Sequence, residues 1–192
     1  MKVSLYIIVD ISSSMSEMGK IHLQRNLCRY AVQLLSIDQG KYADIDLRFY
    51  QWAQNISEIS VQSDRDIPAL KTEGSTSINV LSDFISQSIN DTERQMFLIL
   101  SDGNIANSDI LNYQNQLKLF PDLIIRTVAV GADADLLKLK KLSTNNSVHL
   151  SENISSAIDS TIFGAEEDVA APESTTQILR AKPTEPVEDW DA

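Results

Sequence analysis

The sequence is poor in cysteine and in basic residues, and it contains no long apolar run. Cys28 is the single cysteine of 192 residues, so no disulfide can form within the chain and we expect a reducing compartment. No apolar stretch approaches the ~18 residues that a membrane-spanning helix needs. The 27 acidic and 16 basic side chains give a formal net charge of -11, which argues against nucleic acid or an anionic membrane as the main partner.

The chain also lacks the local motifs of several enzyme classes. It has neither a G-x-S-x-G nucleophile elbow nor a P-loop. Of its two histidines, His22 lies in a helical pattern and His149 in a short strand pattern, so we expect packed or surface residues rather than catalytic bases. Cys28 has apolar neighbours in the same helical pattern and is expected in the core. These absences favour a protein that is not an enzyme.

The first ten residues, MKVSLYIIVD, have one lysine, a short apolar run and no small-residue cleavage site. This pattern predicts a core strand rather than a secretory signal peptide. Together with the single cysteine, it leads us to expect a cytoplasmic protein.

Three segments are almost continuously apolar, which is typical of strands that are covered on both faces; they are residues 3–9, 96–100 and 123–130. Alternating segments at 45–49 and 55–61 predict a strand and an edge strand that pairs with it, and 147–150 predicts a short strand. Apolar residues recur with helical spacing in five segments between the strands. The first has Leu23, Leu27, Tyr30, Ala31 and Leu34 on one face, and the others are 78–89, 107–119, 133–142 and 152–163.

Buried strands that alternate with amphipathic helices predict an α/β fold. We expect a Rossmann-like, doubly wound, mostly parallel sheet with helices on both faces and one antiparallel edge strand. Ligands of such sheets bind beyond the carboxyl ends of the strands, where the strand order reverses. Asp10 ends the first strand and therefore lies where a site is expected.

The composition changes at Gly164, so we expect one domain over residues 1–163 and an acidic, disordered tail over 164–192. The tail has three of the five prolines and shows no sustained apolar period. Thr175 and Thr176 each precede an aliphatic residue by three positions, a spacing that resembles what forkhead-associated domains read in phosphopeptides. They are candidate phosphorylation sites, and Trp190 is a candidate docking residue. A kinase, a phosphatase or a forkhead-associated protein would be the partner of the tail.

The first apolar strand runs into the sequence DISSS, in which Asp10, Ser12 and Ser14 alternate. Alternate residues of an extended turn can point the same way, so three hard oxygen atoms could converge. Hard oxygen donors suit Mg²⁺, Ca²⁺ or Mn²⁺. The ordinary alternative is a helix N-cap, because Asp and Ser are common there.

Two further segments carry oxygen ligands to the same edge of the predicted sheet. The sequence FLILSDG ends a buried strand and places Asp102 before Gly103, and EGSTSI places Thr76 in a loop of small residues before a helix. A strand-end turn and a helix cap would explain each segment separately. Their conjunction with Asp10 favours one shared site.

These three segments resemble the metal-ion-dependent adhesion site (MIDAS) of the von Willebrand factor A (VWA) domain. The resemblance covers residues 3–163 and includes the late VAVGAD segment. It implies a site for Mg²⁺ or Mn²⁺ in which Ser12, Ser14 and Thr76 give hydroxyl oxygens and Asp10 and Asp102 bind directly or through water. Such an ion keeps an open position for an acidic side chain of a partner protein.

A narrower resemblance is to bacterial tellurite-resistance and stress-type (TerY-like) VWA proteins. It rests on the size of the chain, the absence of a signal peptide and the early start of the first strand. It implies a cytoplasmic adaptor in a stress-response or phospho-signalling assembly.

Two other functions remain open at this stage. A Mg²⁺-dependent phosphohydrolase of the haloacid-dehalogenase type also has an aspartate after its first strand, but its motif is D-x-D, and Ser12 cannot act as the second acid. A structural scaffold would use the metal only to rigidify the loops. The sequence does not decide whether Tyr50 and Trp52 are core or rim residues.

Overall fold

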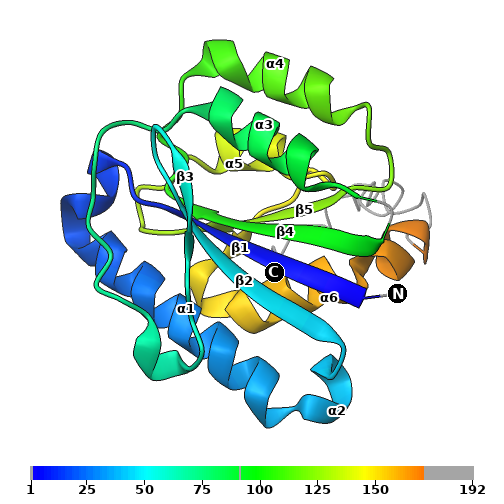
Figure 1. The fold of residues 1–192 in the computed structure, drawn as a ribbon. Coiled ribbons are helices and arrows are strands. Elements are labelled where there is room, and N and C mark those ends of the chain that lie inside the picture. The colour runs from blue at the N-terminus through cyan, green and yellow to red at the C-terminus, as the bar shows by residue number, and fades with distance from the viewer. Residues whose placement is uncertain (1, 91, 171–192) are drawn as a thin grey trace, which may run out of the picture.

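A six-stranded sheet forms the centre of the fold in the computed structural model, which describes residues 2–90 and 92–170 (Figure 1). Its strands are β1 (Lys2–Asp10), β2 (Ile45–Trp52), β3 (Ile56–Ile59), β4 (Glu93–Ser101), β5 (Ile124–Ala129) and β6 (His149–Leu150). Their order across the sheet is β3-β2-β1-β4-β5-β6. All neighbours are parallel except β3, which pairs antiparallel with β2. The predicted mostly parallel sheet with an antiparallel edge strand is confirmed.

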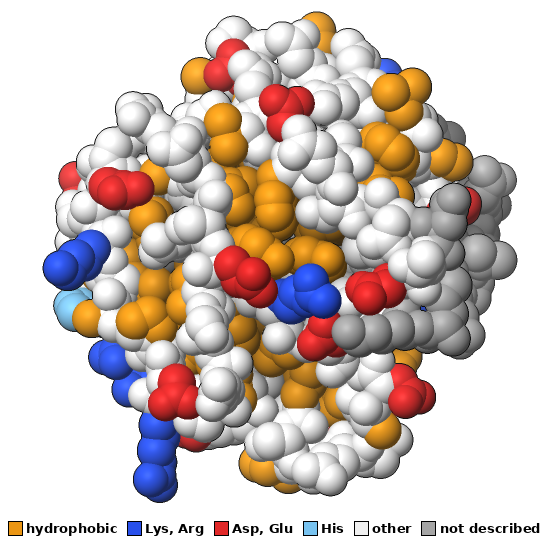
Figure 2. Space-filling model, in the orientation of Figure 1, with side chains coloured by type: hydrophobic (Ala, Val, Ile, Leu, Met, Phe, Trp, Pro, Cys, Tyr) orange, Lys and Arg blue, Asp and Glu red, His pale blue; other side chains and the backbone are white. Residues whose placement is uncertain are grey.

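Helices cover both faces of this sheet. They are α1 (Lys20–Ile37), α2 (Gln39–Tyr42), α3 (Ile78–Ser88), α4 (Asn107–Leu117), α5 (Leu136–Leu142) and α6 (Ile154–Ala170). One core cluster lies between the sheet and α1 and α6, and the other lies between the sheet and α3, α4 and α5. Short 3-10 turns at Ser13–Gly19, Asp64–Asp66 and Ser151–Asn153 complete the elements. On the face shown in Figure 2, apolar side chains are visible in the middle of the view, and a row of acidic and basic side chains crosses them.

The two clusters explain why the central strands have no polar face. In β1, Leu5, Ile7 and Val9 belong to the α1 and α6 side, whereas Tyr6 and Ile8 belong to the other side. Successive side chains of a strand point to opposite faces, so a strand that is covered twice must be apolar throughout. Full burial of one such side chain contributes about 1.5–3 kcal/mol to folding.

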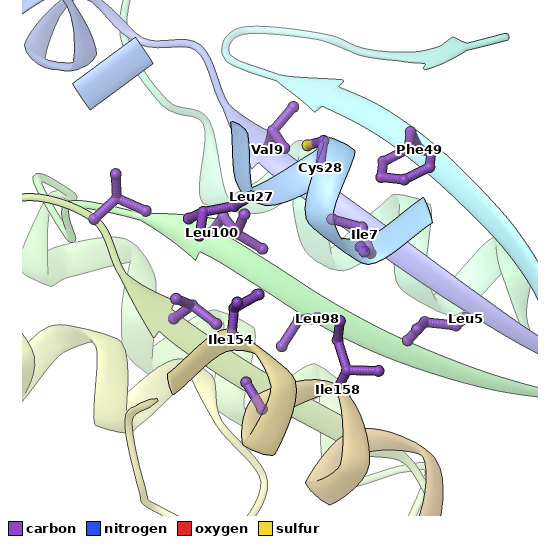
Figure 3. Packing of buried hydrophobic residues seen from close by; sticks show 14 of the residues in the cluster. Leu5, Ile7, Val9, Leu27, Cys28, Phe49, Leu98, Leu100, Ile154 and Ile158 are labelled. Carbon is purple, nitrogen blue, oxygen red and sulfur yellow. The ribbon is translucent and has the colours of Figure 1, made fainter. Parts of the chain in front are cut away.

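Helix α1 packs a narrower stripe against the sheet than its sequence pattern indicates. Leu27, Cys28 and Ala31 are buried, and Figure 3 shows Leu27 and Cys28 above the central strands. Burial raises the pKa of the Cys28 thiol to about 12, so Cys28 is a core residue, as expected. Tyr30 was expected on the same face, but it is 41% exposed, because it lies at the margin of the stripe.

The end of the described chain lies in α6. This helix was expected to end at Phe163, but it runs on to Ala170 and so crosses the expected domain boundary at Gly164. Thr175, Thr176 and Trp190 lie outside the described residues. None of the helices in the described part of the chain has both the length and the apolar character of a segment that crosses a membrane.

Candidate metal centre

The predicted site residues lie at the point where the strand order reverses. The chain places β2 on one side of β1 and β4 on the other, so the carboxyl ends of β1 and β4 border the switch point of the sheet. Asp10 is the last residue of β1, and Asp102 directly follows β4. Both carboxylates are therefore positioned by the two central strands of a packed core.

Asp10 is fully buried and is held by neutral donors. Its Oδ1 accepts a hydrogen bond from the Ser12 amide at 2.8 Å, and its Oδ2 accepts one from Ser101 Oγ at 2.6 Å. Burial raises the pKa of Asp10 to about 6, although these hydrogen bonds oppose the shift. The carboxylate thus lacks full compensation for its charge and would gain from a nearby cation.

The two serines of the first loop face each other. Ser12 Oγ and Ser14 Oγ are 3.1 Å apart, with Ser12 buried and Ser14 partly exposed. Ser12 occupies the N-cap position of the following 3-10 turn, but its side chain makes no capping hydrogen bond. The capping interpretation therefore does not describe Ser12, and two hydroxyl oxygens are left side by side next to Asp10.

The loop that carries Thr76 is fastened to the first loop by backbone hydrogen bonds. Ser13 donates to the Gly74 carbonyl through both its amide (2.9 Å) and its hydroxyl (2.8 Å), and the Glu73 amide donates to the Ile11 carbonyl at 2.7 Å. On the far side of Thr76, the indole of Trp52 donates to the Ser77 carbonyl at 2.9 Å.

Trp52 and Tyr50, whose position the sequence left open, are both core residues with exposures of 0% and 8%. Thr76 is partly exposed and donates to the Asn104 carbonyl at 3.3 Å. This bond links the second loop to the third, which begins at Asp102.

The third loop is tightly constrained. Asp102 is 4% exposed, and its Oδ1 accepts a hydrogen bond from the Asn104 amide at 3.0 Å. Gly103 has a φ of +74°, and a Cβ there would lie 2.7 Å from the Asp135 carbonyl oxygen, so only glycine fits. The Gly103 amide donates to Ser101 Oγ at 3.0 Å. Ser101 therefore joins the Asp10 carboxylate to the turn that carries Asp102.

Lys20 is a residue of the site that the sequence analysis missed. Its Nζ donates to Asp102 Oδ2 at 2.9 Å and to Asp133 Oδ2 at 2.8 Å, and its side chain is 2% exposed. Burial acts to lower the pKa of Lys20, but the hydrogen bonds to Asp133 and Asp102 outweigh it and raise the pKa. The pKa of Asp133 is correspondingly lowered by its bond to Lys20. The sequence contained one indication of this role. A lysine in the first turn of a helix is disfavoured by the helix dipole, so its presence there indicates a separate interaction that holds it.

The structure thus brings all the predicted ligands to one edge of the sheet, where hydrogen bonds connect the three loops; they are Asp10, Ser12, Ser14, Thr76 and Asp102. Two carboxylates and three hydroxyls form a hard oxygen set, which is compatible with Mg²⁺ or Mn²⁺. Within residues 2–90 and 92–170, no group of three or more His, Cys, Asp or Glu side chains is arranged to hold a metal ion, so a metal here depends on the hydroxyls. A cavity of about 410 Å³ opens beside the site, lined in part by Ser14, Lys20, Asp102 and Asn104.

Comparison with known proteins identifies the fold. No protein-family model and no curated protein sequence matches the chain. Among solved structures, proximal thread matrix protein 1 from the mussel byssus, with a zinc-occupied MIDAS motif, has a TM-score of 0.59 at 13% identity, over 84% of this chain and 47% of that one. A von Willebrand factor type A protein from Catenulispora acidiphila has a TM-score of 0.61 at 13% identity, over 81% of this chain and 40% of that one.

The ArnB paralog VWA2 from Sulfolobus acidocaldarius gives 0.60 at 15% identity, over 84% of this chain and 46% of that one. The chain spans less than half the length of each of these structures. At such low identities the likeness shows the fold alone, and that fold is the VWA fold.

Proposed function

We propose that this chain is a non-enzymatic protein-binding module that depends on a divalent metal. Mg²⁺ or Mn²⁺ would be held by the five oxygen ligands defined above and would capture a carboxylate of a partner protein. The observation that supports this most is the meeting of three loops at the switch point, where the ligands of doubly wound sheets bind. The zinc-occupied MIDAS of the mussel protein supports a divalent ion at such a site.

The chemistry of the ligands favours capture of an anion. Three of the five ligands are neutral hydroxyls, so the two carboxylates balance the charge of a divalent ion without exceeding it, and a carboxylate of a partner could still complete its coordination. The accessible side of the site carries Ser14, Thr76 and Asn104, whereas Asp10 lies beneath them in the core. A partner would therefore meet the metal through the hydroxyl side.

The phosphohydrolase alternative is disfavoured by the environment of Asp10. A nucleophilic carboxylate must reach its substrate, but Asp10 is 0% exposed and both of its oxygens accept hydrogen bonds from the protein. Neither His22, which is exposed on α1, nor His149, in β6, donates to Asp10. Turnover of a generic phosphate ester with Mg²⁺ would favour the enzyme, and we expect none.

A narrower role as a bacterial cytoplasmic adaptor in tellurite resistance, stress response or phospho-signalling rests only on the resemblance of the sequence to TerY-like proteins. The tail residues Thr175, Thr176 and Trp190 would extend that role toward kinases, phosphatases or forkhead-associated proteins. This narrower role stays a prediction.

The test is a Mg²⁺-dependent pull-down from the native cell, followed by affinity measurements on the partner. Thr76→Ala should weaken partner binding by about 2–4 kcal/mol, and chelator should do the same. Thr76→Ser is the matched control, because it keeps the hydroxyl and should bind like the wild type. The thermal melt of Thr76→Ala should be nearly unchanged, since Thr76 is a partly exposed loop residue. If the wild type, Thr76→Ala and the chelated protein all bind the partner equally well, the metal has a purely structural role.

A further inference from the structure

The candidate metal centre contains a buried cation of its own. The Lys20 ammonium lies 2.9 Å from Asp102 Oδ2 and 2.8 Å from Asp133 Oδ2. Lys20 and Asp102 are almost completely buried, whereas the side chain of Asp133 is 45% exposed. The ion pair between Lys20 and Asp102 is therefore buried at the metal-binding edge, whereas Asp133 contacts Lys20 from the solvent side.

The fold makes room for this cation. Lys20 is the first residue of α1, where the helix dipole disfavours a positive charge. A Cβ on Gly131 would lie 2.8 Å from Lys20 Cδ and 3.0 Å from Lys20 Cγ, so glycine at that position is what lets the side chain pass. Three segments that are far apart in the sequence thus combine to hold an ammonium group against one metal ligand.

The ammonium changes the charge that a bound ion would experience. Among the buried groups of the site, Asp10 and Asp102 bring two negative charges and Lys20 cancels one of them, whereas Asp133, the other partner of Lys20, is 45% exposed and its charge is screened by water. A divalent ion at the site would then retain one net positive charge instead of being neutralised. The ammonium would repel the ion itself and attract an incoming anion. Lys20 lines the cavity beside the site together with Lys138 and four acidic residues, Glu17, Asp102, Asp133 and Asp135.

We propose that Lys20 sets the ligand preference of the metal centre: it weakens the binding of the metal and strengthens the capture of a carboxylate by the bound metal. This inference rests on the proposed function, because it concerns the same ion and the same class of anionic ligand. Lys20 is a positioning residue here, since it acts through Asp102 and through its charge. Its two effects have opposite signs, which a merely structural lysine would not produce.

The experiment uses Mn²⁺ and acetate as probes with the full-length chain. Water-proton relaxation reports Mn²⁺ binding, and at saturating Mn²⁺ it falls when acetate displaces a bound water. In Lys20→Met the Kd for Mn²⁺ should fall by about tenfold or more and the Kd for acetate should rise by about tenfold or more, because one unit charge roughly 4 Å away changes a binding constant about fivefold at the dielectric of water and by far more at the lower dielectric of a protein. Lys20→Arg should keep both constants near the wild-type values, because it keeps the charge.

Asp133→Asn is the matched control. It removes the outer partner of Lys20 but leaves the pair with Asp102, so both constants should stay within about threefold of wild type. Lys20→Gln covers the case in which Lys20→Met does not fold, because its amide can still donate to Asp102 and Asp133 while the charge is lost. It should shift both constants in the same directions as Lys20→Met.

The outcomes separate the two proposals. If Lys20→Met weakens both Mn²⁺ and acetate, or changes neither, the inference about Lys20 is wrong while the metal site stands. A folded Lys20→Gln that leaves both constants unchanged would also overturn it. If wild-type protein binds no Mn²⁺, the proposed function itself fails.

Discussion

Asp10 and Asp102 occupy equivalent places in the fold, but their surroundings differ in kind. Each lies at the carboxyl end of a central parallel strand at the switch point, and their exposures are 0% and 4%. Asp10 accepts hydrogen bonds from an amide and a hydroxyl, both neutral, whereas Asp102 accepts one from the Lys20 ammonium. The neighbours of a buried carboxylate, rather than its place in the fold, therefore decide how much it gains from an external cation.

The largest expected effect comes from breaking the internal pair. In metal-free protein, Asp102→Asn leaves the buried Lys20 ammonium with only the partly exposed Asp133. We expect a loss of about 3–5 kcal/mol in the free energy of unfolding, the usual cost of removing one partner of a buried ion pair. Urea unfolding of metal-stripped protein measures it. A loss no larger than that of Asp133→Asn would show that Lys20 does not depend on Asp102.

The next effect concerns Asp10 and the metal. Asp10→Ala should weaken Mg²⁺ or Mn²⁺ binding by at least ~100-fold, since changes beyond the direct ligands alone cost 10–100-fold. Isothermal titration calorimetry should show one site in the wild type and none in the variant. Asp133→Asn is the control, because Asp133 is an acidic residue at the same edge. It should bind the metal with the same heat as the wild type. An unchanged titration of Asp10→Ala would remove Asp10 from the ligand set.

The third prediction is a pH dependence that belongs to Asp10. Its pKa is raised from 3.8 to about 6 in the folded, metal-free protein, so protonation favours the folded state. The stabilising contribution is complete below about pH 3.8 and is lost as the pH rises through 6. Metal-stripped wild type should lose about 2–3 kcal/mol of unfolding free energy from this group between pH 4 and pH 7.

Asp10→Asn tests this pH dependence directly. The unfolding free energy of the variant should lack the part of the pH dependence that comes from Asp10. At pH 7 without metal, Asp10→Asn should be more stable than the wild type, whereas Asp102→Asn should be less stable. Urea unfolding at several pH values compares the two proteins. Identical slopes for wild type and Asp10→Asn would contradict the raised pKa.

The smallest effect should come from Ser101, whose hydroxyl joins the two carboxylate loops. Ser101→Ala removes the 2.6 Å hydrogen bond to Asp10 and the 3.0 Å bond from the Gly103 amide, at a cost of about 1 kcal/mol. It should also raise the pKa of Asp10 further, so Mn²⁺ binding should need a higher pH. Ser4→Ala is a matched control, because buried Ser4 donates to the Glu93 carboxylate from the other end of β1. If Mn²⁺ binding has the same pH dependence in Ser101→Ala and Ser4→Ala, Ser101 does not influence the pKa of Asp10.

The sequence predicted the fold and brought the candidate ligands together because both depend on local patterns. Continuous apolar runs indicate doubly covered strands, and the residues after them must meet at one edge of a parallel sheet. The partner of Asp102 could not be predicted in this way. Lys20 reaches Asp102 only because α1 begins beside the turn after β5, where Gly131 leaves the space. Such a contact depends on the packing of segments over 80 residues apart.

The bond from the Trp52 indole to the Ser77 carbonyl gives the site a built-in optical reporter. Trp52 is fully buried at the end of β2, and its 2.9 Å bond ends on the residue next to Thr76. Indole emission responds to the polarity and hydrogen bonding of its surroundings, so a movement of this loop would change the fluorescence. The chain has two tryptophans, and Trp190→Phe leaves Trp52 as the single emitter. Stopped-flow mixing of that variant with Mg²⁺ would then follow, in real time, whether the Thr76 loop moves when the ion binds.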